Sequence, residues 1–219
     1  MGLAGFFCAL LRVKCGQLTR AGILDSILDL YKLSAAGFKE KFGSDPLTSE
    51  FLFSNCITKL ERALEIAQTT DLVFLELGCG VGLNPVIAKK LGLTSSYGID
   101  INPKLIEESN RNLTLVLERG LLPNCNPPVY KWGNFFTEEQ LETIHSELDD
   151  IAHKHLILDN PYPGSDVYKQ LGIGFDEVDL FYMYPWHGKD LDYFRRFFRE
   201  QAKKGALLLL RDGRIIQNI

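Results

Sequence analysis

Three glycines on alternate positions, with an acidic residue on either side, form the pattern in this 219-residue chain that carries the most chemical information. The glycines are Gly78, Gly80 and Gly82, and the acidic residues are Glu76 and Asp100. Glycine lets the backbone turn tightly and lets a ligand lie against bare main chain. A carboxylate that follows such a turn after one more helix and strand is placed to accept hydrogen bonds from ribose hydroxyls. The pattern therefore indicates a nucleoside site.

The surrounding residues predict the β-α-β unit that must position this pattern. Residues 72–77 are a short, mostly apolar run that suits a strand buried on both faces of a parallel sheet. Asn84 is expected to cap the following helix, and Gly92 is well placed to end it. A second apolar run, 96–99, leads into Asp100. The turn and Asp100 then lie at the carboxyl ends of two strands, where ligands bind in open parallel sheets.

The spacing of the glycines distinguishes between nucleoside-containing cofactors. A dinucleotide fingerprint needs a third glycine at the position of Leu83, so an NAD-linked oxidoreductase is disfavoured. The pattern from Glu76 to Gly82, followed by Asp100, resembles the first motif and the ribose-binding acid of the class I S-adenosylmethionine-dependent methyltransferases. The resemblance covers roughly residues 71–211 and implies bound S-adenosylmethionine and methyl transfer. A scaffold that binds this cofactor without turnover stays an alternative.

The resemblance also implies a fold and a set of cofactor contacts. The fold is α/β, with a doubly wound, mostly parallel sheet. In the family, the turn after the third strand often reads Gly-Asp-Phe, and its polar side chain meets the adenine amino group. Asn134 stands at that position here and can accept the same hydrogen bond through its carbonyl oxygen. The cofactor-binding residues that the resemblance implies are Glu76, Gly78, Cys79, Gly80, Gly82, Asp100, Ile101, Asn134 and Phe135.

The remaining segments predict helices before the first strand and alternating elements after it. Residues 1–70 are expected to form a helical N-terminal extension, and residues 71–219 the α/β domain. In proteins that resemble this one, such helices cover the cofactor or shape the substrate pocket; simple packing on the sheet is the alternative. A helix capped by Asn102 and ended by Gly120, a strand over 129–132 and a helix opened by Thr137 are expected next.

Two apolar runs compete to be the fourth strand. We expect residues 178–184 to be the fourth strand and 206–210 the fifth, with 159–174 as an insertion. In the rival register, 155–160 would be the fourth strand and 178–184 the fifth. The tail, 211–217, predicts a tight hairpin because Asp-Gly suits a type I′ turn.

Candidates for the acceptor side of the site follow these two runs. Methyl transfer requires alignment and, for a poor nucleophile, removal of a proton, so a dedicated catalytic residue is optional. Asn160 opens an Asn-Pro-Tyr-Pro stretch that resembles the Asn/Asp-Pro-Pro-aromatic motif of methyltransferases acting on amide or amine nitrogens. A plain proline turn is the alternative. Tyr184 can line a pocket with Trp186, and His187 can act as a base near neutral pH.

The composition limits the classes of acceptor and partner that we expect. A net charge of −4 disfavours duplex nucleic acid, so a small molecule or a protein is the expected acceptor. Five cysteines, an odd number without a Cys-x-x-Cys pair, indicate reduced thiols, no metal site and a cytoplasmic protein. No apolar run is long enough to span a membrane.

Overall fold

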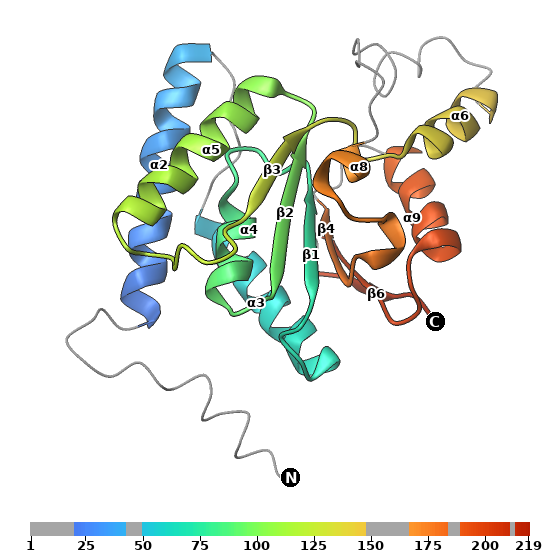
Figure 1. The fold of residues 1–219 in the computed structure, drawn as a ribbon, viewed down its shortest axis with the longest axis horizontal. Coiled ribbons are helices and arrows are strands. Elements are labelled where there is room, and N and C mark those ends of the chain that lie inside the picture. Colours follow the sequence, from blue (N-terminus) through green and yellow to red (C-terminus); the bar gives the residue numbers. More distant parts are fainter. Residues whose placement is uncertain (1–19, 43–49, 148–166, 184–188, 211–212) are drawn as a thin grey trace.

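A six-stranded sheet forms the centre of the computed structural model, which describes residues 20–42, 50–147, 167–183, 189–210 and 213–219 (Figure 1). The strand order is β3-β2-β1-β4-β5-β6. Neighbouring strands from β3 to β5 are parallel, and β6 is antiparallel to β5. The strands are β1 (Val73–Leu77), β2 (Ser95–Asp100), β3 (Val129–Trp132), β4 (Leu180–Met183), β5 (Leu207–Leu210) and β6 (Ile215–Gln217). The predicted doubly wound, mostly parallel α/β sheet is confirmed.

The order in which the strands are added reverses at β1. The chain runs from β1 outward through β2 to β3 and then crosses to β4 on the other side of β1. Leu77, the last residue of β1, pairs with Ile99 of β2 on one side and with Met183 of β4 on the other. Ligands of open α/β sheets bind at such a reversal, beyond the carboxyl ends of the strands.

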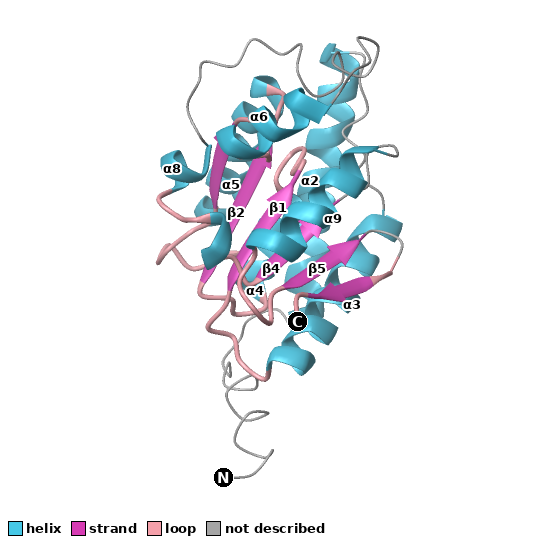
Figure 2. Cartoon of the chain, turned by 90° about the vertical axis from the view of Figure 1, so that its right-hand side faces the viewer, coloured by secondary structure: helices cyan, strands magenta, loops and turns pink. Residues whose placement is uncertain are grey.

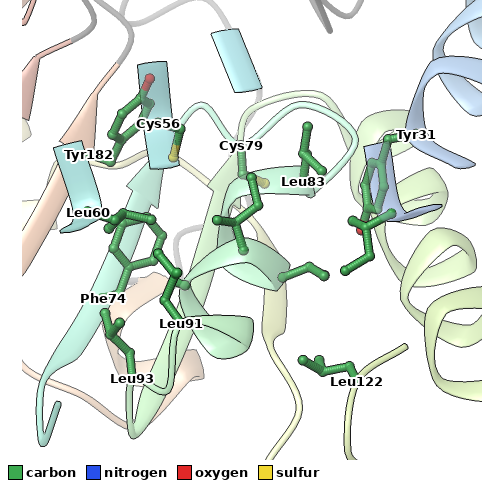
Figure 3. Close-up of a cluster of buried hydrophobic side chains, with 14 of the residues drawn as sticks. Tyr31, Cys56, Leu60, Phe74, Cys79, Leu83, Leu91, Leu93, Leu122 and Tyr182 are labelled. Atoms are coloured by element: carbon green, nitrogen blue, oxygen red, sulfur yellow. The ribbon is translucent and has the colours of Figure 1, made fainter. Parts of the chain in front are cut away.

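Helices cover both faces of the sheet (Figure 2). They are α2 (Arg20–Phe42), α3 (Glu50–Ala67), α4 (Leu83–Lys90), α5 (Pro103–Glu118), α6 (Glu138–Glu147), α8 (Val167–Leu171), the 3₁₀ helix η1 (Phe175–Glu177) and α9 (Lys189–Gln201). Because strand side chains alternate between faces, Phe74 packs with residues of α2 to α5, whereas its neighbour Leu75 packs with residues of α6, α8 and α9. Figure 3 shows the first of these clusters.

The N-terminal helices pack on the sheet side that carries α4 and α5. Ile27 and Tyr31 of α2 and Leu60 of α3 are fully buried in the same cluster as Phe74. The apolar stripe at helical spacing is what buries α2. The division into an extension over 1–70 and a domain over 71–219 stays a prediction.

The predicted start of α4 is wrong in one respect. Asn84 does not cap the helix; α4 begins at Leu83, directly after Gly82, which has a left-handed φ of 86°. Glycine adopts that conformation without strain, so the helix follows the turn with no side-chain cap. Asn84 instead lies in the first turn and bonds Glu76. Gly92 ends the helix as predicted, with φ 98° and its N–H donating to the Lys89 carbonyl at 3.0 Å.

The other predicted helix boundaries are confirmed. The Asn102 side chain caps α5 by accepting from the Lys104 N–H at 3.0 Å, and Gly120 follows the helix with φ 65°. Thr137 and Gln140 exchange the two hydrogen bonds of a capping box, at 3.2 and 3.1 Å, before α6.

The preferred register of the fourth strand is also confirmed. Residues 180–183 pair with β1, and residues 207–210 pair with them as the fifth strand. The rival run, 155–160, lies outside the described residues. The predicted C-terminal hairpin is present, with the Leu210 N–H donating to the Arg214 carbonyl at 2.9 Å.

Candidate functional site

The glycine turn after β1 is held tightly against the end of β2. Gly78, Gly80 and Gly82 have φ values of 75°, 55° and 86°, which L side chains rarely adopt. The N–H groups of Gly78 and Cys79 both donate to the Ile99 carbonyl at 2.9 Å. Three left-handed residues on alternate positions fold the chain back on itself, and the turn therefore lies directly beside the carboxyl end of β2.

Asp100 ends β2 and joins the turn to the next loop. Its Oδ2 accepts from the Gly80 N–H and its Oδ1 from the Asn102 N–H, both at 2.8 Å. Burial raises the pKa of this carboxyl to about 6, although these backbone hydrogen bonds lower it. The two hydrogen bonds therefore fix the orientation of the side chain, and its protonation state changes near pH 6.

Glu76 is a second buried carboxyl on the neighbouring strand. Its Oε1 accepts from Asn84 Nδ2 at 2.5 Å, whereas its buried Oε2 has no hydrogen-bond partner within the described part of the chain. Burial is the main cause that raises the pKa of Glu76 well above its usual value, and the nearby charge of Asp100 raises it further. A buried acceptor without a partner is costly and marks a place for a hydrogen-bond donor.

The adenine-side residues of the prediction lie at the ends of β2 and β3. Ile101 is 38% exposed, and its carbonyl accepts from Trp132 Nε1 at 2.9 Å. Asn134 is buried, and its Oδ1 accepts from the Phe136 N–H at 3.0 Å. Phe135 is half-buried, and its ring packs on that of Phe136, with centroids 4.7 Å apart.

Cys79 points into the core. It is 5% exposed, and burial is the main cause that raises the pKa of its thiol. At this position the turn can therefore present its backbone, and not the thiol, to a ligand, and the thiol stays protonated at neutral pH.

The predicted acceptor-side residues lie outside the part of the chain that the structure describes. They are Asn160, Tyr184 and His187. Within the residues that are described, no group of His, Cys, Asp or Glu is arranged to hold a metal ion. No helix among them is both long enough and apolar enough to cross a membrane.

Part of the chain is similar in sequence to known methyltransferases. No protein-family model matches the chain. Over 57 residues it is 40% identical to a ribosomal protein L11 methyltransferase from Cupriavidus pinatubonensis, covering 26% of this chain and 18% of that protein. A protein of the same name from Paraburkholderia phytofirmans is 37% identical over 57 residues, with the same coverage of 26% and 18%. The match spans less than a fifth of these relatives' length.

Two solved structures are also similar to this chain. A putative S-adenosylmethionine-dependent methyltransferase from Methanococcus maripaludis superimposes with a TM-score of 0.45 and 12% identity, covering 91% of this chain and 66% of that one. An RNA methyltransferase from Salinibacter ruber, in complex with S-adenosyl-L-homocysteine, has a TM-score of 0.42 and 18% identity, with coverage of 70% and 73%.

Several residues that support the glycine turn were not identified from the sequence as doing so. They are Tyr31, Asn84, Ser109, Asn112 and Tyr130, and each bonds a group of the turn or of β1. One signal for two of them was present, since Ser109 and Asn112 are polar residues three apart on the buried side of α5. The other contacts join distant segments and left no local signal.

Proposed function

We propose that the chain is an S-adenosylmethionine-dependent methyltransferase. One observation carries the proposal: the buried Asp100 carboxylate, at the carboxyl end of β2, is held beside the glycine turn that follows β1 by its hydrogen bond from the Gly80 N–H. Each carboxylate oxygen accepts one backbone N–H and keeps a lone pair free. Asp100 can therefore accept the two ribose hydroxyls of the cofactor without giving up its hold on the turn.

The unpartnered oxygen of Glu76 fits a ligand that carries hydrogen-bond donors. Its buried Oε2 lacks a partner within the described residues, and a donor such as an ammonium group satisfies it. The bound cofactor supplies a methyl group on a good leaving group. The chain's residues bind and orient it: Asp100 at the ribose, Glu76 at a polar end, and Ile101, Asn134 and Phe135 near the adenine.

The acceptor is proposed to approach from the carboxyl end of β4. Asn160, Tyr184 and His187 are the candidates for contacting it, with His187 as a possible base. A small molecule or a protein is favoured because the net charge of −4 suits neither a duplex nor another extended polyanion. The relatives named for ribosomal protein L11 support a protein acceptor. We place the enzyme in the cytoplasm, as the unpaired cysteines suggest.

Calorimetric titration with S-adenosylmethionine, S-adenosylhomocysteine and NAD tests the proposal. We expect both adenosyl compounds to bind with micromolar Kd and NAD to give no heat. Binding of NAD alone would support the oxidoreductase alternative, and silence from all three would refute the cofactor assignment. Binding without methyl transfer to any protein or small-molecule acceptor tested, followed by mass spectrometry, would favour the non-catalytic scaffold.

A further inference from the structure

Every backbone carbonyl from Gly80 to Gly82 accepts a hydrogen bond from a side chain on another element. Ser109 Oγ donates to the Gly80 carbonyl at 2.9 Å, and Asn112 Nδ2 donates to the Val81 carbonyl at 3.2 Å. Both donors come from one face of α5, where they are fully buried. The turn is thus fastened to α5 along its length.

The Gly82 carbonyl accepts two hydrogen bonds from two tyrosines. The Tyr130 hydroxyl of β3 donates at 2.6 Å and the Tyr31 hydroxyl of α2 at 3.2 Å. Both side chains are buried, burial raises the pKa of each phenol so that both stay protonated, and the two hydroxyls also hydrogen-bond each other. Figure 3 shows Tyr31 projecting from α2 into the core on the side of α4 where Leu83 lies.

Fixing these carbonyls also fixes the opposite side of the turn. A peptide unit is planar and trans, so the N–H of residue 83 points away from the Gly82 carbonyl, and the N–H of residue 81 points away from the Gly80 carbonyl. With the carbonyls held toward α2, α5 and β3, these N–H groups point to the other side of the turn. The first N–H groups of a helix such as α4 have no partner within the helix and suit a polar ligand.

We propose that Tyr31 and Tyr130 are positioning residues that hold the glycine turn in its cofactor-binding shape, and that docking of α2 is therefore coupled to cofactor binding. This inference rests on the proposed function. It assigns α2 a role in cofactor affinity through the Gly82 carbonyl, which Tyr31 reaches from α2. Because coupling between two events is reciprocal, bound cofactor must in turn stabilise the docked α2.

Tyr→Phe variants test the proposal because they remove one hydroxyl and keep the ring. Ser34→Ala is the matched control: Ser34 is buried on α2 and donates to Glu108 of α5, so the variant removes a hydroxyl from the same helix and leaves the Gly82 carbonyl with both of its tyrosine donors. Titration with S-adenosylhomocysteine should show affinity about threefold lower for Tyr31→Phe and about tenfold lower for Tyr130→Phe, the range of one hydrogen bond. Ser34→Ala should bind within about twofold of wild type.

Hydrogen exchange provides a second measurement, and its first part uses only the wild-type protein. In the wild type, S-adenosylhomocysteine should slow exchange of the amides of α2, and this protection should be lost in Tyr31→Phe. Folded Tyr31→Phe and Tyr130→Phe proteins with wild-type affinity would overturn the proposal. Unchanged exchange in α2 on binding would also overturn it. A wild type that binds neither adenosyl compound would instead refute the proposed function, which distinguishes the two failures.

Discussion

Replacing Gly82 by alanine should destabilise the protein for two separable reasons. A Cβ at this position would lie 2.8 Å from Ser109 Cβ and 2.8 Å from the Tyr130 ring, and the backbone φ is 86°. The left-handed conformation alone costs an L residue about 1–2 kcal/mol. Overpacking a filled core costs about 1–3 kcal/mol more. The ring cannot move aside freely, because its hydroxyl is bonded to the Gly82 carbonyl.

Gly205 provides a control with the same backbone conformation and no crowding. Its φ is 87°, and a Cβ there would meet nothing within 4 Å. Gly205→Ala should therefore show the conformational cost only. Urea unfolding followed by circular dichroism gives both values, and the difference between the variants should be about 1–3 kcal/mol. With a slope of about 2 kcal/mol/M, the midpoint of Gly82→Ala should lie roughly 0.5–1.5 M below that of Gly205→Ala.

Equal midpoints for the two variants would refute this reasoning. They would mean that Tyr130 and Ser109 do not press on the turn as the structure shows. If Gly82 were required only for close approach of the ligand, alanine would leave the two midpoints equal and weaken binding of S-adenosylhomocysteine instead.

Three further predictions concern the buried carboxyls. Asp100→Ala should weaken S-adenosylhomocysteine binding by about 1.5–3 kcal/mol in calorimetry, since hydrogen bonds to a charged group are lost; the exposed Asp192→Ala is the control, and equal affinity would misplace the ribose. Because the pKa of Asp100 is raised from 3.8 to about 6, the native state between these two pH values holds a proton that the unfolded state has lost. The free energy of unfolding should therefore fall by about 3 kcal/mol as the pH rises from about 4 to above 6. Asp100→Asn should abolish this fall, and parallel plots of unfolding free energy against pH for the wild type and the variant would contradict the prediction. Glu76→Gln should raise the thermal midpoint at pH 8, because burial penalises the charged carboxylate, while weakening cofactor binding; a lower midpoint in scanning fluorimetry would disagree.

Local signals in the sequence were sufficient for most of the fold. Short apolar runs over 72–77, 96–99 and 129–132 predicted strands, and glycines such as Gly92 and Gly120 predicted the ends of helices. These signals work because strand burial and helix termination depend on residues next to one another. The choice of residues 178–184 as the fourth strand also came from local order, since a helix and a clear strand follow it.

The error at Asn84 shows where local rules stop applying. Asparagine before a proline is a good helix cap, but here the helix already begins at Leu83, and the Nδ2 of Asn84 donates to the buried Glu76 carboxyl eight residues earlier. Only the packing of β1 against α4 brings that acceptor within reach. The outcome was decided by tertiary contact and not by propensity.

The sequence by itself determined the order of elements, the glycine turn and the carboxylate that follows it, because these depend on residue type and short spacing. Only the tertiary structure decided what holds the turn in place. Tyr31 and Tyr130 lie 51 and 48 residues from Gly82, and both reach the same carbonyl. No periodicity connects residues so far apart; they meet because α2 and β3 pack into one core, where a buried carbonyl must find its donors.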